Sequence, residues 1–217
     1  IDQIAEWRQH TPFSVGTVRS INFTGGGEPT VHPKYHEIIE YAIDCGFLVT
    51  LITNGSRLNK LAKHLSREKA EKIIWVGVDV DSAVDTTYEH IRRSLTTFDM
   101  LSTVKLHIRP MFDLSTQKIF EVTDTLKADV QAISTLTGVK YSLPENRKEP
   151  RTYTKCHQMF LYTIFAANGD ISVCCESRGQ KRFVIGNWFD EDIRDIWMKD
   201  RHMEVYNSVN TTLCPPC

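Results

Sequence analysis

Residues 21–33 have the sequence INFTGGGEPTVHP, in which an apolar segment runs into three glycines, a glutamate and a proline. The overlapping residues 18–24 (VRSINFT) have the composition of a β-strand, and signals for a helix begin near Lys34. Glycine lets a backbone approach a ligand closely, and ligands bind at the C-terminal ends of parallel strands in α/β proteins. The stretch therefore predicts a strand, a ligand-binding loop and a helix in succession.

The alternation of strand and helix continues to about residue 144. Such alternation indicates parallel βα units. The further strands are predicted at residues 47–53, 72–79, 104–111 and 139–143, and the helices at residues 1–9, 35–45, 58–65, 86–95 and 115–126.

Each predicted strand has an apolar face and a mixed or polar face. In residues 72–79, for example, Ile74, Val76 and Val78 share one face. A doubly wound sheet covered on both sides would be apolar throughout, so the pattern favours a curved, barrel-like sheet around a ligand. The residues expected to line its cavity are Asn22, Thr24, Asn54, Gly77, Asp79, His107 and Arg109.

The pattern changes after a polar segment at residues 148–155, which predicts a linker. Residues 160–167 and 170–175 flank Asn168-Gly169, a strong hairpin signal. Asp190 is predicted to cap a helix that continues to about Tyr206. A small hairpin-plus-helix unit is therefore expected over residues 156–217.

The composition narrows the possible partners and the compartment. The 217 residues include 26 Lys+Arg and 27 Asp+Glu, which gives a net charge of −1. This balance argues against non-specific nucleic-acid binding, and no stretch approaches the ~18 apolar residues of a membrane helix.

Clustered cysteines in such a chain favour metal binding in a reducing compartment, so we expect a cytoplasmic protein. Five of the 6 cysteines lie in the last third, at Cys156, Cys174, Cys175, Cys214 and Cys217.

Four motifs stand at the end of a predicted strand or in the element after it. They are INFTGGGEPTVHP at 21–33, LITNG at 51–55, VGVDVDSA at 76–83 and Tyr88-x-x-Ile91-Arg92. With them, residues 1 to about 130 resemble the radical S-adenosylmethionine (SAM) superfamily. The resemblance implies a partial (β/α)6 TIM-like barrel over residues 1–147 that binds SAM.

The resemblance also assigns roles to single residues. The Gly-Gly-Glu segment of that family binds the methionine amino group of SAM, with the following proline shaping the turn. Asp79 stands where the family has a ribose contact, and His107 or Arg109 is a candidate for the SAM carboxylate or an acidic substrate group. The expected cofactor-binding residues are Gly25, Gly26, Gly27, Glu28, Pro29, Asn54, Asp79, His107 and Arg109.

The C-terminal cysteines resemble the auxiliary iron–sulfur extension called SPASM or twitch. Cys156, Cys174 and the pair Cys214-x-x-Cys217 would then hold a [4Fe–4S] cluster. Structural zinc is the alternative, because it also binds four cysteines that include a Cys-x-x-Cys pair. Cys175 is a spare that either packs as a small apolar residue or replaces Cys174, and Cys45 is expected in the core.

The sequence departs from the family at its beginning. The family carries a Cys-x-x-x-Cys-x-x-Cys loop after its first strand, but no cysteine precedes Cys45 and only five of six strands are predicted. We expect that the chain starting at Ile1 lacks this strand and loop. The alternative is a degenerate member that binds a ligand without radical chemistry. Whether further cysteines follow Cys217, as in a full SPASM domain, stays open.

By resemblance, a reduced [4Fe–4S] cluster on the missing loop cleaves SAM to a 5′-deoxyadenosyl radical, which abstracts hydrogen from a substrate carbon. The auxiliary cluster would anchor the substrate or accept the remaining electron. Four C-terminal ligands favour a sugar or cyclitol substrate, whereas a full SPASM domain favours peptide maturation. Expected partners are the substrate and an external electron donor, with no nucleic acid or membrane. A zinc-stabilised binding module is the alternative without catalysis.

Overall fold

The computed structural model describes residues 1–10, 18–25, 27–79, 104–107, 112–113, 118–119, 124–138, 140–142, 153–175 and 179–214. The chain forms two compact units. Unit 1 combines Ile1–Thr17 with Asn146–Cys217, and unit 2 is Val18–Glu145.

Unit 2 is built on a five-stranded sheet in which every neighbouring pair is parallel. The strand order follows the chain without a reversal, and the parallel α/β pattern predicted from the sequence is confirmed. In sheet order the strands are β1 (Ser20–Phe23), β2 (Leu48–Thr53), β3 (Ile73–Asp79), β4 (Val104–His107) and β7 (Lys140–Ser142).

Helices connect these strands where the apolar periodicity predicted them. A short 3-10 turn, η1 (Pro29–Val31), leads into α2 (Tyr35–Asp44). The next crossover contains α3 (Leu58–His64) and α4 (Arg67–Ala70), and the Ser66 hydroxyl caps α4 by accepting from Lys69 N at 3.3 Å. The helix predicted at 86–95 lies outside the described residues.

The helix predicted at residues 115–126 is wrong. Strand β6 (Lys118–Ile119) lies in that range and pairs with the antiparallel strand β5 (Phe112–Asp113) before it, and helix α6 begins only at Asp124 and extends to Thr137. Ile119 pairs with Phe112 in the register of this hairpin. Asp124 instead suits a helix start, and its carboxylate accepts from Lys127 Nζ at 2.8 Å.

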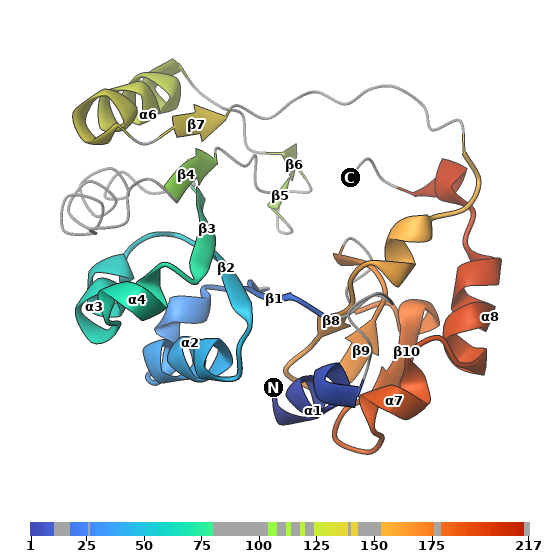
Figure 1. The fold of residues 1–217 in the computed structure, drawn as a ribbon. Helices are drawn as coiled ribbons and strands as arrows, with labels where there is room; N and C mark the ends of the chain where they lie inside the picture. The colour runs from blue at the N-terminus through green and yellow to red at the C-terminus, as the bar shows by residue number, and fades with distance from the viewer. Residues whose placement is uncertain are drawn as a thin grey trace. The chain divides into compact units, whose positions relative to one another are not determined.

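Strand β2 has one fully buried face, as the alternation predicted. In β2, Val49, Leu51 and Thr53 are at most 2% exposed, whereas the residues between them are partly exposed. Figure 1 shows helices α2, α3 and α4 beside β2 and β3, and these helices also carry buried apolar residues. Those helix residues include Ile39, Ala42, Ile43, Leu58, Leu61 and Ala70.

A bulge in β3 changes the predicted face of one residue. Val49 pairs with Ile73, but Thr50 pairs with Trp75, so an extra residue stands between the two pairs. A bulge reverses the alternation locally, and Ile73 is buried while Ile74 is 48% exposed. The placement of Ile74 on the buried face was therefore wrong.

Unit 1 contains a three-stranded antiparallel sheet of order β10-β9-β8. The hairpin predicted at Asn168-Gly169 is confirmed, and Gly169 has the positive φ of 88° that its turn requires. The elements of unit 1 are α1 (Asp2–His10), η3 (His157–Phe160), β8 (Ile164–Phe165), β9 (Asp170–Ser172), η5 (Lys181–Phe183), β10 (Val184–Asn187), α7 (Ile193–Ile196), α8 (Asp200–Ser208) and η6 (Thr211–Leu213).

The single helix predicted from Asp190 to Tyr206 is wrong, because the segment forms two helices. Asp192, not Asp190, caps α7 by accepting from Arg194 N at 2.8 Å. The helix then breaks at Met198, whose φ is 59° and whose N–H donates to His202 Nδ1 at 3.1 Å. Burial lowers the pKa of His202, which keeps the imidazole neutral and able to accept this bond.

Helix α1 belongs to unit 1, although unit 2 follows it in the chain. The Trp7 ring meets the Trp197 ring edge-on at 6.3 Å, and Arg194 Nη1 lies 3.2 Å from Glu6 Oε1. Both contacts place α1 beside α7, as Figure 1 also shows.

In the described parts of the chain, no helix is long and apolar enough to cross a membrane.

The hairpin turn yields a stability prediction. A Cβ at Gly169 would overlap side-chain atoms of Asn187 and Phe189, whereas at Gly179, which also has positive φ, it would meet nothing within 4 Å. We expect Gly179→Ala to lower the free energy of unfolding by about 1 kcal/mol through backbone strain alone. Gly169→Ala should cost about 1–3 kcal/mol more through overpacking.

Denaturant titration followed by tryptophan fluorescence measures the difference, because Trp7, Trp188 and Trp197 of the 4 tryptophans lie in unit 1. Equal destabilisation by the two variants would contradict the crowding around Gly169.

Candidate functional site

The Glu28 carboxylate connects the loops that follow β1 and β2. Its Oε1 atom accepts from Thr30 N at 2.9 Å, Thr30 Oγ1 at 2.5 Å and Thr53 Oγ1 at 2.6 Å. Its Oε2 atom accepts from Asn54 N at 2.5 Å. All four donors are neutral, so they orient the carboxylate without cancelling its charge.

The two threonines of this network are buried, and the loop after β2 is fixed around them. Thr30 is 0% exposed and Thr53 is 2% exposed. Thr53 Oγ1 accepts from Gly55 N at 3.1 Å, and Asn54 Oδ1 accepts from Ser56 N at 3.0 Å. The Asn54 side chain therefore shapes its own loop, while its backbone N–H reaches Glu28.

Arg57 and Tyr35 hold the backbone of the Glu28 loop from the other side. Arg57 Nη1 donates to Thr30 O at 3.2 Å and to Val31 O at 3.3 Å. The Tyr35 hydroxyl donates to Arg57 O at 2.6 Å. Burial raises the pKa of Tyr35 to about 12, so this hydroxyl stays protonated as a donor.

The glycine loop before Glu28 is open at Gly27. A Cβ at Gly27 would meet nothing within 4 Å, and Gly27 does not have positive φ. The fold of the described residues therefore does not itself require glycine at position 27. Gly25 is also in the described loop, whereas Gly26 is outside it.

The partly exposed face of the sheet carries an aromatic residue that sequence reasoning did not select. Asn22 pairs with Thr50, and Thr50 pairs with Trp75, so the three residues are neighbours across β1, β2 and β3. A Cβ at Gly77 would overlap the six-membered ring of Trp75. The indole of Trp75 therefore covers Gly77, which is buried.

Of the remaining predicted residues, the structure brings Asp79 and His107 to paired positions of β3 and β4. Both stand at the C-terminal ends of their strands, the edge of the sheet where Glu28 also lies. Arg109 lies outside the described residues.

Three of the four predicted cluster ligands are described: Cys156, Cys174 and Cys214. Thr211 joins the segments of two of them, because its N–H donates to Thr154 O at 3.2 Å and its hydroxyl to Tyr153 O. Cys156 and Cys214 both pack against the hydrophobic core of unit 1. Cys174 directly follows Val173, which belongs to the same core.

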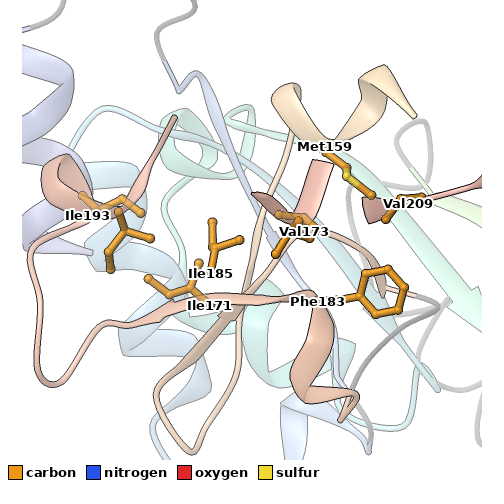
Figure 2. Packing of buried hydrophobic residues seen from close by; sticks show 9 residues of the cluster. Met159, Ile171, Val173, Phe183, Ile185, Ile193 and Val209 are labelled. Atoms are coloured by element: carbon orange, nitrogen blue, oxygen red, sulfur yellow. The ribbon is translucent and has the colours of Figure 1, made fainter. Parts of the chain in front are cut away.

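Figure 2 shows the buried core residues of unit 1 that lie near these cysteines in the sequence. Met159, Val173 and Val209 lie together in it, and each is at most five residues from a predicted ligand. Thiols are the donor type that iron–sulfur clusters use. Within the described ranges, however, no three His, Cys, Asp or Glu side chains are arranged to hold a metal ion. Cys217 lies outside those ranges.

The other two cysteines occupy different places. Cys175 is exposed, and its sulfur lies 3.6 Å from the Tyr162 hydroxyl. Cys45 is the C-cap residue of α2 in unit 2 and is partly exposed.

Comparison with known protein families matches both parts of the chain. Residues 1–112 match the Radical SAM superfamily, and residues 156–217 match the iron–sulfur cluster-binding domain SPASM.

Two curated proteins are similar to shorter stretches. An S-adenosylmethionine-dependent nucleotide dehydratase from Selenomonas ruminantium is 42% identical over 67 residues, which cover 31% of this chain and 24% of that protein. The antilisterial bacteriocin subtilosin biosynthesis protein AlbA from Bacillus subtilis (strain 168) is 27% identical over 106 residues, or 46% of this chain and 23% of AlbA. The chain thus spans about a quarter of the length of these relatives.

The fold resembles that of BtrN. The crystal structure of BtrN in complex with AdoMet and 2-DOIA aligns with a TM-score of 0.56 at 13% identity, covering 98% of this chain and 76% of BtrN. An open conformation of BtrN gives a TM-score of 0.53 at 15% identity. The similarity extends over both units.

The family match covers more than half of the sequence, and the predicted family is confirmed. The chain belongs to the radical SAM superfamily and carries a SPASM domain, so its cofactors are SAM and [4Fe–4S] clusters.

Proposed function

We propose that this chain supplies the SAM site and the auxiliary-cluster site of an enzyme that abstracts hydrogen from a substrate carbon. The Glu28 network carries this proposal. The four donor groups described around this carboxylate are neutral, so none of them is a counter-charge. The amino acid part of SAM carries an ammonium group, and a charge-assisted hydrogen bond to a fixed carboxylate is stronger than a neutral one.

The other predicted residues are assigned around this contact. Gly25, Gly26 and Gly27 form the loop beside the methionine part of SAM, with Pro29 starting the turn η1. The loop of Asn54 closes the site through its backbone N–H. Asp79 is assigned to the ribose, and His107 or Arg109 to the SAM carboxylate or an acidic substrate group.

We infer that the sheet of unit 2 is part of a partial (β/α)6 barrel. A doubly wound sheet reverses its strand order at a switch point, whereas the order β1-β2-β3-β4-β7 runs in one direction. The full burial of only one face in β2 also supports a sheet that curves around a cavity.

The auxiliary cluster is assigned to Cys156, Cys174, Cys214 and Cys217. When bound, the clusters of such an enzyme supply the electron for SAM cleavage and accept the electron left after hydrogen abstraction. The chain's own part is to hold SAM through Glu28, to orient the substrate over Trp75 and to exclude water from the radical.

The proposed substrate is a sugar or cyclitol oxidised at a hydroxyl-bearing carbon. The four-cysteine set supports this class, and so does the name of the Selenomonas relative, since a nucleotide contains a sugar ring. Peptide maturation is the second candidate, supported by the AlbA similarity over 46% of the chain.

The SAM contact is tested by Glu28→Gln in anaerobically reconstituted protein. Glutamine is neutral, and its amide N–H group opposes the donors around position 28. We expect the Kd for SAM to rise at least about tenfold, the equivalent of one charged hydrogen bond. Formation of 5′-deoxyadenosine at low SAM should fall in parallel.

Glu37→Gln provides the matched control, because this substitution removes the same charge at an exposed position of α2. An unchanged SAM affinity in Glu28→Gln would refute the assignment of Glu28.

The auxiliary cluster is tested by single Cys156→Ser, Cys174→Ser and Cys214→Ser variants. Each should lose about four irons per chain and the corresponding visible absorbance, because serine is a poor ligand for a [4Fe–4S] cluster. Cys45→Ser should retain the iron content of the parent. A colourless parent that contains zinc would instead support the binding-module alternative.

The substrate class is tested by deuterium transfer. Deuterated sugars, cyclitols and nucleotides are compared with a deuterated precursor peptide, and mass spectrometry detects deuterium in 5′-deoxyadenosine. We expect label only from the ring-containing small molecules. Label from the peptide alone would establish the maturase alternative.

A further inference from the structure

The hydrogen bonds around Glu28 distinguish its two oxygens. A carboxylate oxygen offers about two acceptor positions. Oε1 receives three donors, two from Thr30 and one from Thr53. Within the described residues, Oε2 receives one donor, from Asn54 N. With respect to these donors, Oε1 is saturated and Oε2 keeps an acceptor position.

The Thr53 hydroxyl is fixed in its role as a donor. Its oxygen accepts from Gly55 N at 3.1 Å, and its own hydrogen points to Glu28 Oε1 at 2.6 Å. Since Thr53 is 2% exposed, water cannot readily replace this hydroxyl. The hydroxyl thus fixes both the Glu28 carboxylate and the start of the Asn54-Gly55 loop.

Thr30 is fixed in a similar way from the opposite loop. It is fully buried, and both its N–H and its hydroxyl donate to Oε1. Its carbonyl oxygen accepts from Arg57. The two threonines therefore hold Oε1 from the β1 side and the β2 side at once.

We propose that Thr53 and Thr30 are positioning residues that hold Oε1 of Glu28 from both loops and so direct Oε2 to the ammonium group of SAM. This inference rests on the proposed function, in which Glu28 binds that ammonium. Neither threonine touches the ligand, and both act through the orientation of the carboxylate.

The test uses Thr53→Val, which keeps the shape of the side chain and removes only the hydroxyl, and Thr53→Ser, which restores it. In the reconstituted holoenzyme, Thr53→Val should raise the Kd and KM for SAM about tenfold, the equivalent of one hydrogen bond to a charged group. The kcat at saturating SAM should change by less than about twofold, because the lost hydrogen bond orients Glu28 for SAM binding and takes no part in the chemical step. Thr53→Ser should match the parent.

A second readout follows the loop without SAM. Hydrogen exchange at the amides of Asn54 and Gly55 should accelerate in Thr53→Val and not in Thr53→Ser, because both amides bond within the network. If Thr53→Val fails to fold by circular dichroism, the pair Thr30→Val and Thr30→Ser is compared in the same assays, with the same expectation.

The outcomes separate the two proposals. A parent enzyme that does not bind SAM refutes the proposed function and this inference with it. A parent that binds SAM, with equal affinities in the valine and serine variants, refutes the positioning role alone. A fall in kcat at unchanged KM also overturns it, since that result places the hydroxyl in the chemical step.

Discussion

The Glu28 carboxylate is the contact on which the arrangement of unit 2's ligand edge depends. Parallel pairing brings the ends of β1 and β2 to the same edge, but it does not by itself join the loops that follow them. The Glu28 side chain joins these loops by accepting from residues that are 2, 25 and 26 positions away. Hydrogen bonds to a charged group are worth about 1.5–3 kcal/mol each and are costly to leave unmade in a buried site. The same carboxylate that is proposed to bind the cofactor therefore also holds the loops that surround it.

Much of the fold was predictable because it follows from local patterns. Apolar periodicity predicted the five strands of the parallel sheet and helices α2 and α3, and the Asn168-Gly169 pair predicted the hairpin of unit 1. The errors arose where a distant residue decides the local structure. Met198 interrupts the predicted last helix while its N–H bonds the buried His202 side chain, and the bulge at Ile74 appears only in the pairing with β2.

The site was predictable to a similar extent. Glu28 and the glycines were evident from the motif, but Thr30 and Thr53 were not, because a buried threonine next to a glycine loop has no signal of its own in a single sequence. Trp75 was missed for a related reason, since its position over Gly77 depends on a contact within one strand that periodicity does not resolve. In unit 1 the cysteine spacing suggested the ligand set, whereas the link between residues 153–154 and Thr211 required the structure.

The grouping of α1 with α7 affects how the protein is made. Glu6 and Arg194 are 188 residues apart in the chain, and the whole of unit 2 lies between them. A ribosome that adds about 5–20 residues per second needs roughly 10–40 s to produce the partner of α1. Until then the Trp7 side of the helix lacks Trp197, which packs against it in the folded protein. Unit 2 can therefore fold on the ribosome before unit 1, whose two segments meet only after all of unit 2 has been made.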